Sequence, residues 1–180
     1  MSQKSGQVLS VSRSAVHEFS KQPAGSIRLL EGLGVDGDAH AGTTVRHRSR
    51  VARNPTQPNL RQVHLIETEL LEDLATLHHV VRPGDLGENI TTTGIDLLRL
   101  PTGTLLDIGE AQVRLTGLRN PCRQIDNFQA GLLKQVVRRD GNPGFRGGVM
   151  AVVTGSGSVR HGDEITAVLP QGPYVALTRV

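Results

Sequence analysis

The chain of 180 residues carries 20 Lys and Arg against 17 Asp and Glu, so its formal net charge is +3. Its one cysteine, Cys122, excludes an intrachain disulfide framework and any Cys-rich zinc or iron–sulfur site. Aromatic residues make up 2 % of the chain, which argues against nucleic acid as a partner because there is no stacking platform for single-stranded bases.

The composition favours a β-rich fold. We expect one domain over residues 1–180, since this length suits a single core. The 21 glycines and nine prolines predict many turns, and so a mainly β architecture with few helices. The first residues lack the apolar core of a secretory signal, and no apolar run is long enough to span a membrane. We therefore expect a cytoplasmic location and no membrane partner.

Two strands and a long loop are predicted in the first third of the chain. Apolar patterns typical of strands lie at Gln7–Ser12 and Ile27–Leu30. Residues 41–61 are poor in apolar side chains and contain Pro55 and Pro58. Loops of this length inside a compact domain are usually functional or disordered, and we interpret residues 41–61 as one long surface loop.

Between these segments Asp36, Asp38 and His40 alternate along the chain. In an extended segment they would face one side, where they could hold a divalent metal. Asp36-Gly37-Asp38 is also ordinary turn chemistry, in which carboxylates bond their own backbone. We favour the turn, because no further ligand is suitably spaced. His40 is expected to contact a ligand, since a polar turn flanked by glycine is rarely part of a core.

The long loop carries a basic cluster of Arg46, His47, Arg48, Arg50 and Arg53. One interpretation is a solvated, mobile basic segment. The other is a phosphate-gripping lid over an anionic ligand, because planar guanidinium groups bind phosphate through two hydrogen bonds. The sequence leaves both open.

The middle of the chain predicts a strand, a helix and a second strand. The strand is Gln62–Ile66, and the helix is Glu67–Leu77 with four leucines on its buried side, Leu70, Leu71, Leu74 and Leu77. A corner at residues 84–89 is expected to need positive φ at its glycines before the strand Asn89–Thr93.

The last part of the chain predicts paired strands. Residues 103–110 and 157–164 each resemble a strand with a tight acidic turn, and we interpret both as hairpin corners of a curved sheet. Ala111–Thr116 alternates like a half-buried strand. The nearly continuous apolar run Gly148–Thr154 predicts a central strand.

Cys122 follows the strand Ala111–Thr116 and precedes apolar residues at helical spacing, namely Ile125, Phe128, Leu132 and Val136. If Asn120 caps this helix, with Pro121 as its first residue, the thiol lies in the first turn near unpaired N–H groups. If Asp126 is the cap, with Gln129 three residues later, Cys122 lies in the loop just before the helix. Both registers place the sulfur where a strand gives way to a helix.

Arg119 and Arg123 flank Cys122, and nearby positive charge favours the thiolate over the thiol. The alternative is a buried cysteine that serves as a small apolar side chain. Its Arg, Asn and Pro neighbours would make a poor apolar pocket, so we favour a reactive or ligating cysteine.

Four stretches of the chain occur in an order that carries a family resemblance. They are Gly34–Gly42, Gly84–Ile90, Arg119-Asn120-Pro121-Cys122 with Gln124-Ile125-Asp126, and Gly162–Ile165. In these residues, and from about Val8 to Leu169, the sequence resembles the molybdenum cofactor sulfurase C-terminal (MOSC) domain family.

The resemblance implies a β-barrel that binds molybdenum–molybdopterin, an anionic pterin cofactor, with Cys122 as metal ligand and catalytic residue. It also implies sulfur transfer or the reduction of N-hydroxylated compounds. The residues expected to bind the cofactor are Arg119, Asn120, Arg123, Asn89, His40, Arg46 and Arg48.

Three rival functions stay open: a persulfide carrier at Cys122, a cofactor-binding module without catalysis, and a basic adaptor for nucleic acid. An external electron donor or sulfur donor protein is the expected partner. No pyridoxal phosphate site is expected, because no aminotransferase-like sulfurase domain is attached.

Overall fold

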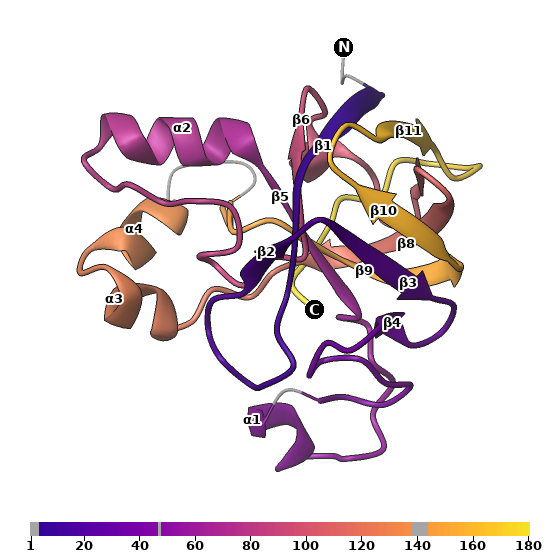
Figure 1. Cartoon of the computed structure of the whole chain (residues 1–180), viewed down its shortest axis with the longest axis horizontal. Helices are drawn as coiled ribbons and strands as arrows, with labels where there is room; N and C mark the ends of the chain where they lie inside the picture. The colour runs from indigo at the N-terminus through magenta and orange to yellow at the C-terminus, as the bar shows by residue number, and fades with distance from the viewer. Residues whose placement is uncertain (1–3, 47, 138–143) are drawn as a thin grey trace.

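The computed structural model describes residues 4–46, 48–137 and 144–180, and its strands form a closed barrel (Figure 1). The barrel strands are β1 (Ser5–Arg13), β5 (Val63–Glu67), β6 (Ile90–Thr93), β7 (Leu105–Ile108), β8 (Ala111–Leu118), β9 (Val149–Gly155) and β11 (Glu164–Val168). They are joined in the order β11-β7-β8-β9-β5-β6-β1, and antiparallel pairing of β1 with β11 closes the ring. The predicted β-barrel with few helices is confirmed.

Four shorter strands lie against or beside the barrel. They are β2 (Gln22–Ala24), β3 (Ser26–Leu30), β4 (Gly34–Val35) and β10 (Gly157–Arg160). Strand β2 continues the main sheet beyond β1, whereas β10, β3 and β4 form a separate small sheet. After β4, a turn at residues 36–40 leads into the long 41–61 segment.

The helices are short. They are α1 (Arg48–Val51), α2 (Thr68–Thr76), α3 (Gln124–Phe128) and α4 (Leu132–Val136), with a 3-10 helix, η1, at Leu97–Arg99. Helices α2, α3 and α4 gather on one side of the barrel (Figure 1). They enclose a second apolar cluster that includes Leu74, Ile125 and Leu132. α1 lies within the 41–61 segment, apart from the other helices (Figure 1).

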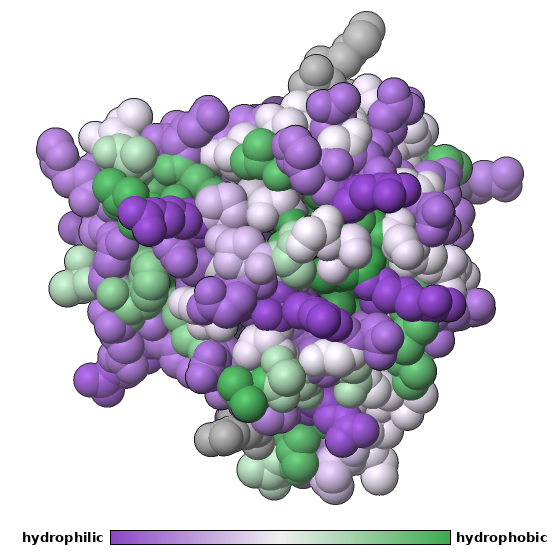
Figure 2. All heavy atoms as spheres, viewed as in Figure 1, coloured by the Kyte–Doolittle hydropathy of each residue, from purple (hydrophilic) through white to green (hydrophobic). Residues whose placement is uncertain are grey.

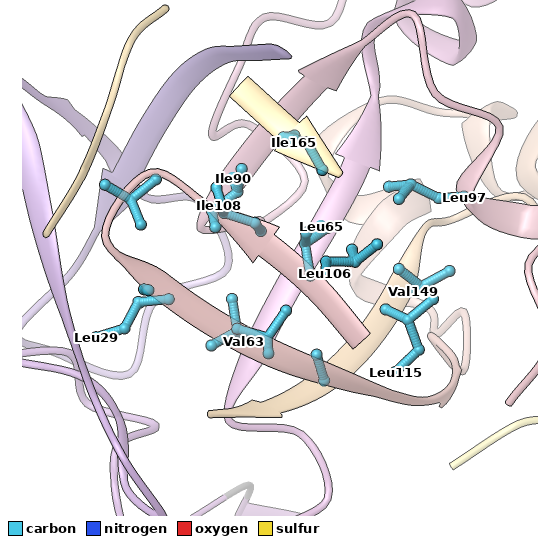
Figure 3. Close-up of a cluster of buried hydrophobic side chains, with 14 of the residues drawn as sticks. Leu29, Val63, Leu65, Ile90, Leu97, Leu106, Ile108, Leu115, Val149 and Ile165 are labelled. Atoms are coloured by element: carbon cyan, nitrogen blue, oxygen red, sulfur yellow. The ribbon is translucent and has the colours of Figure 1, made fainter. Parts of the chain in front are cut away.

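The barrel interior is filled by aliphatic side chains (Figure 3). Leu65, Leu106 and Val149, from three different strands, are all fully buried. Complete burial of one such side chain contributes about 2 kcal/mol to the stability of the fold, so aliphatic side chains can stabilise the barrel without Trp. The outer surface is mostly hydrophilic, with scattered apolar residues on the face drawn in Figure 2. No helix in the described ranges is long and apolar enough to cross a bilayer.

Most predicted strands form, with ends shifted by a few residues. The predicted strand Gly148–Thr154 is β9, which lies between β8 and β5 as a central strand should. The corner before β6 has positive φ at Gly84 and Gly87, as expected. The predicted helix is α2, but Leu77 lies at its C-cap and is 47 % exposed, so its place on the buried face is wrong.

One of the two predicted hairpin corners is wrong. β7 and β8 pair across a two-residue turn, with Ile108 opposite Ala111. β10 and β11 do not pair with each other, because β10 joins β3 whereas β11 joins β7 and β1. The chain leaves the small sheet at this turn and enters the barrel.

The segment 41–61 is more ordered than a plain surface loop. It contains α1, and an isolated bridge joins Thr44 to Pro58 near its two ends. Val45 is buried, and the Asn59 side chain donates to the carbonyl oxygens of His40 and Gly42, both at 3.0 Å. These contacts fold the segment back onto the barrel end.

Candidate functional site

A pocket of about 440 Å³ opens at one end of the barrel, between the 41–61 segment and the turn that follows β8. Its walls come from seven parts of the chain: the β1–β2 connection, the turn after β4, the 41–61 segment, β5, the corner before β6, the turn after β8, and β9. The lining residues are Glu18, Phe19, Lys21, His40, Val45, Arg46, Arg50, Arg53, Gln57, Asn59, Arg61, His64, Leu86, Gly87, Asn89, Arg119, Asn120, Cys122, Gln124 and Met150. We call it the basic pocket.

The charge of this lining is strongly unbalanced. Six of the described lining residues are cations, Lys21, Arg46, Arg50, Arg53, Arg61 and Arg119, and a single carboxylate, Glu18, lies among them. A concave site of one sign concentrates counter-ions and raises the association rate of charged ligands. The basic pocket is therefore suited to an anion.

Cys122 is half-buried in the pocket wall, in the turn between β8 and α3. Its carbonyl oxygen accepts a hydrogen bond from the Ile125 N–H at 3.1 Å, and its Sγ lies 3.4 Å from Gln124 Oε1. The cysteine is neither sealed in an apolar core nor fully in solvent. Among the predicted alternatives, its placement just before the helix is confirmed.

Both predicted helix caps are wrong. The N-cap of α3 is Arg123, without a side-chain cap, so neither Asn120 nor Asp126 caps it. Asp126 lies in the first turn of α3 and accepts from the Leu133 N–H at 2.8 Å. Gly131, with φ of 83°, divides the predicted helix into α3 and α4. A five-residue helix has little macrodipole, so positive charge near the thiol comes from side chains instead.

Arg119 is a buried cation with an unpartnered nitrogen. It follows β8 directly, its backbone N–H donates to Gly148 O at 3.0 Å, and it is only 7 % exposed. Its Nη1 has no hydrogen-bond partner, and no carboxylate in the described ranges lies at ion-pair distance from it. The guanidinium packs 5.6 Å from the Phe19 ring centre. Burial lowers the pKa of Arg119, whereas a Cys122 thiolate and Glu88 act in the opposite direction.

Arg61 and Lys21 supply further positive charge. Arg61 Nη1 donates to the backbone oxygen of Val180 at 3.4 Å, and burial, then the charges of Arg50 and Arg119, lower its pKa to about 10. Arg61 therefore stays protonated at neutral pH. Lys21 is 6 % exposed, and burial lowers its pKa although the Asp38 carboxylate opposes this.

Asp38 holds this side of the pocket together. Its carboxylate pairs with Lys21 Nζ at 2.9 Å and accepts hydrogen bonds from the Ser14 N–H, the His40 N–H and the Asn89 side chain. Burial alone would raise the pKa of Asp38, but the His40 and Lys21 interactions outweigh it and hold that pKa well below 3.8. The bond to His40 is the predicted Asx turn.

The alternative of a metal site at Asp36, Asp38 and His40 finds no support. Asp36 is exposed while Asp38 is buried, so the three side chains do not face one side. No group of three or more His, Cys, Asp or Glu in residues 4–46, 48–137 and 144–180 is arranged to hold a metal ion.

The structure brings most of the predicted cofactor residues together. Cys122, Arg119, Asn120, Asn89, His40 and Arg46 all line the basic pocket. The Asn89 amide is used by the protein itself, since Nδ2 donates to Ser12 O and Asp38 while Oδ1 accepts from the His64 N–H. Arg123 is exposed and outside the lining. Arg48 begins α1, but its side chain, like all of His47, lies outside the described residues.

Lys21, Arg61 and His64 were not predicted as site residues. Lys21 has no local signal in the sequence. His64 interrupts the apolar run Val63–Ile66, and a polar residue within a buried strand is a signal that could have been used. His64 is 5 % exposed, and its Nε2 lies 2.7 Å from Gly147 O.

Comparisons with known proteins agree with this architecture. Among solved structures, YuaD from Bacillus subtilis is 23 % identical with a TM-score of 0.74, and the match covers 93 % of this chain and 97 % of that one. YiiM from Escherichia coli is 18 % identical with a TM-score of 0.64, over 94 % and 73 % of the two chains. YiiM from Geobacillus stearothermophilus is 15 % identical with a TM-score of 0.64, over 98 % and 80 %. At these identities the likeness shows the fold alone.

A search of curated proteins finds no match to the sequence. The model of the MOSC domain matches residues 37–166, a range that contains Asp38, His64, Asn89, Arg119 and Cys122. This match extends over most of the barrel, and the chain therefore belongs to the MOSC domain family.

Proposed function

We propose that this domain binds molybdenum–molybdopterin in the basic pocket, with Cys122 Sγ as the protein ligand to the metal, and supports the reduction of N-hydroxylated compounds. The observation that carries the proposal is the Arg119 guanidinium, a buried cation that lines the pocket and has no carboxylate at ion-pair distance in the described ranges. A buried polar group without a partner costs about 1–3 kcal/mol, and more when it is charged. An anionic ligand in the pocket would supply the counter-charge that this buried cation lacks.

The residues present fit the cofactor's chemistry. A thiolate is a soft donor and suits a thiophilic transition metal, and Cys122 reaches the pocket from its wall. Lys21, Arg61 and Arg119 supply charge on the same lining, where a phosphate group requires it. Arg46, Arg50 and Arg53 come from the 41–61 segment, which supports its role as a basic cover over the pocket. The metal supplies the redox chemistry when the cofactor is bound.

The chain's own residues then have distinct tasks. Cys122 holds the metal in the pocket wall, and ligation keeps the sulfur deprotonated. Arg119 orients the anionic end, because its backbone is fixed by Gly148 and its side chain by Phe19. His40 and Asn120 lie on the same lining and are proposed to contact the cofactor or substrate. Electrons are proposed to come from a separate donor protein.

The first test measures molybdenum and pterin in protein made in a host that synthesises the cofactor. We expect stoichiometric molybdenum in the wild type, loss of the metal in Cys122→Ser, and loss of pterin and metal in Arg119→Met. Arg123→Ala is the matched control, since Arg123 also neighbours Cys122 but is exposed and outside the lining. Equal cofactor content in Arg119→Met and wild type would contradict the proposal.

Two further measurements separate the rival functions. Cyanide-releasable sulfur at Cys122 in protein that holds no molybdenum would support the persulfide carrier and overturn metal ligation. If the loaded wild type reduces a hydroxylamine compound with an external electron donor, it is an enzyme. A loaded protein without that activity would be a binding module.

A further inference from the structure

His64 is held in one orientation at the wall of the basic pocket. It lies on β5, its backbone N–H donates to Asn89 Oδ1 at 3.2 Å, and its carbonyl oxygen accepts from the Asn89 N–H at 2.8 Å. Its ring Nε2 is 2.7 Å from Gly147 O. A carbonyl oxygen only accepts, so Nε2 must carry the ring proton and donate.

The other ring nitrogen is left for a ligand. Burial, and then the charge of Arg119, lower the pKa of His64 well below 6.5, so the imidazole is neutral. With Nε2 protonated, Nδ1 presents a lone pair. No hydrogen bond in residues 4–46, 48–137 or 144–180 reaches Nδ1, and the side chain lines the pocket.

An acceptor at this position is unusual for its surroundings. Lys21, Arg61 and Arg119 carry donors and no acceptor, and the charge of all three acts on the His64 ring. The amide oxygens of two lining residues are already used, because Asn89 Oδ1 accepts from the His64 N–H and Asn59 Oδ1 from the Arg61 N–H. His64 therefore supplies an acceptor beside three cationic side chains that can only donate.

We propose that His64 is a specificity-determining residue whose Nδ1 accepts a hydrogen bond from an N–H or O–H group of the ligand. The basic pocket then selects anions that also carry a donor, such as the ring amide or amino group of a pterin, over anions without one. This assignment rests on the proposed function only for the identity of the pterin. The acceptor itself follows from the Gly147 contact.

The tautomer is tested first, in wild-type protein from a host that does not make the cofactor. Nitrogen-15 NMR of the imidazole rings should show a protonated Nε2 and an unprotonated Nδ1 at His64. Pterin-6-carboxylate is the probe ligand, an anion with N–H donors, and its addition should shift the Nδ1 resonance. His161, which is exposed and outside the pocket lining, serves as internal control.

Affinity is tested with two anions, sulfate without a hydrogen-bond donor and pterin-6-carboxylate with donors. His64→Gln keeps a donor that can reach Gly147 O and removes Nδ1. We expect it to weaken pterin-6-carboxylate binding by about three- to tenfold, the value of one neutral hydrogen bond, with sulfate affinity unchanged. Arg119→Met should weaken both ligands, and His161→Gln neither.

The outcomes separate this inference from the proposed function. A protonated Nδ1 in the wild type overturns the His64 assignment without any variant, so the test survives if His64→Gln fails to fold. Equal affinity of wild type and His64→Gln for pterin-6-carboxylate also overturns it. So does a wild-type protein that binds sulfate but not pterin-6-carboxylate. If the wild type binds neither anion, the proposed cofactor pocket itself is overturned.

Discussion

Replacement of Asp38 by alanine removes the carboxylate that pairs with Lys21 at 2.9 Å. The two side chains are 2 % and 5 % exposed, so the variant leaves a lysine buried without its counter-charge. It also removes the acceptor for the N–H groups of Ser14 and His40 and for the Asn89 amide. Breaking a buried ion pair in this way costs about 3–5 kcal/mol. We expect the free energy of unfolding to fall by that amount.

Urea unfolding at pH 7, followed by circular dichroism, measures this loss. With a slope of about 2 kcal/mol per molar urea, the midpoint should fall by about 2 M. Asp36→Ala is the matched control: Asp36 is exposed two residues away, so its replacement should change stability by less than about 0.5 kcal/mol.

A double variant and the pH dependence complete the test. Asp38→Leu combined with Lys21→Met removes both charges and should be less destabilised than Asp38→Ala alone. The pKa of Asp38 is lowered in the folded state, so its contribution is present above its ordinary value of 3.8 and is lost as the pH falls through the folded value. A loss below about 1 kcal/mol in Asp38→Ala at pH 7 would refute the reasoning.

Three further replacements test other parts of the structure. Burial, then the charge of Asp96, raises the pKa of Glu67 to about 7 from 4.5, so wild-type stability should fall as the pH rises from 4.5 to 7, by about 1–2 kcal/mol after screening. Glu67→Gln should remove this pH dependence of stability, measured by thermal melts across that range. If the variant shows the same pH dependence, a group other than Glu67 causes it. Gly148 has φ of 93°, and an added Cβ would meet Leu65 O, so Gly148→Ala should cost more than about 1 kcal/mol in urea unfolding. Arg119→Met should stabilise the cofactor-free protein by about 1–3 kcal/mol while it weakens anion binding, and a destabilised variant would mean that the guanidinium has an internal partner.

The barrel strands could be predicted because their signal is local. In β8, buried residues alternate with exposed or half-buried ones from Ala111 to Thr116, and the apolar run of β9 is central. The division between α3 and α4 was missed, because the apolar spacing continues through Gly131 while the backbone there has positive φ. The β10–β11 turn was misread, because sequence alone does not show which sheet each strand joins.

The site was predicted in part for the same reason. Cys122 and Arg119 lie close together in the chain, so one motif predicted both, and both line the basic pocket. Lys21 reaches the basic pocket from the β1–β2 connection, Arg61 from just before β5, and His64 from β5; the folded barrel brings these distant segments beside the turn after β8. The resemblance in the glycine-rich stretches predicted His40 and Asn89 as site residues. It did not predict that the Asn89 side chain donates a hydrogen bond to Asp38.

Closure of the barrel has a consequence for the order of assembly. Ser5 pairs with Thr166 in the strands that complete the ring, and such distant pairings form late and slowly in folding. The residues that line the basic pocket extend from Glu18 to Met150, so an early folding intermediate does not contain the complete pocket. On the proposed function, the cofactor would enter after the polypeptide has folded, past the 41–61 segment. Its delivery would then be a separate step, which a cell could regulate independently of synthesis of the chain.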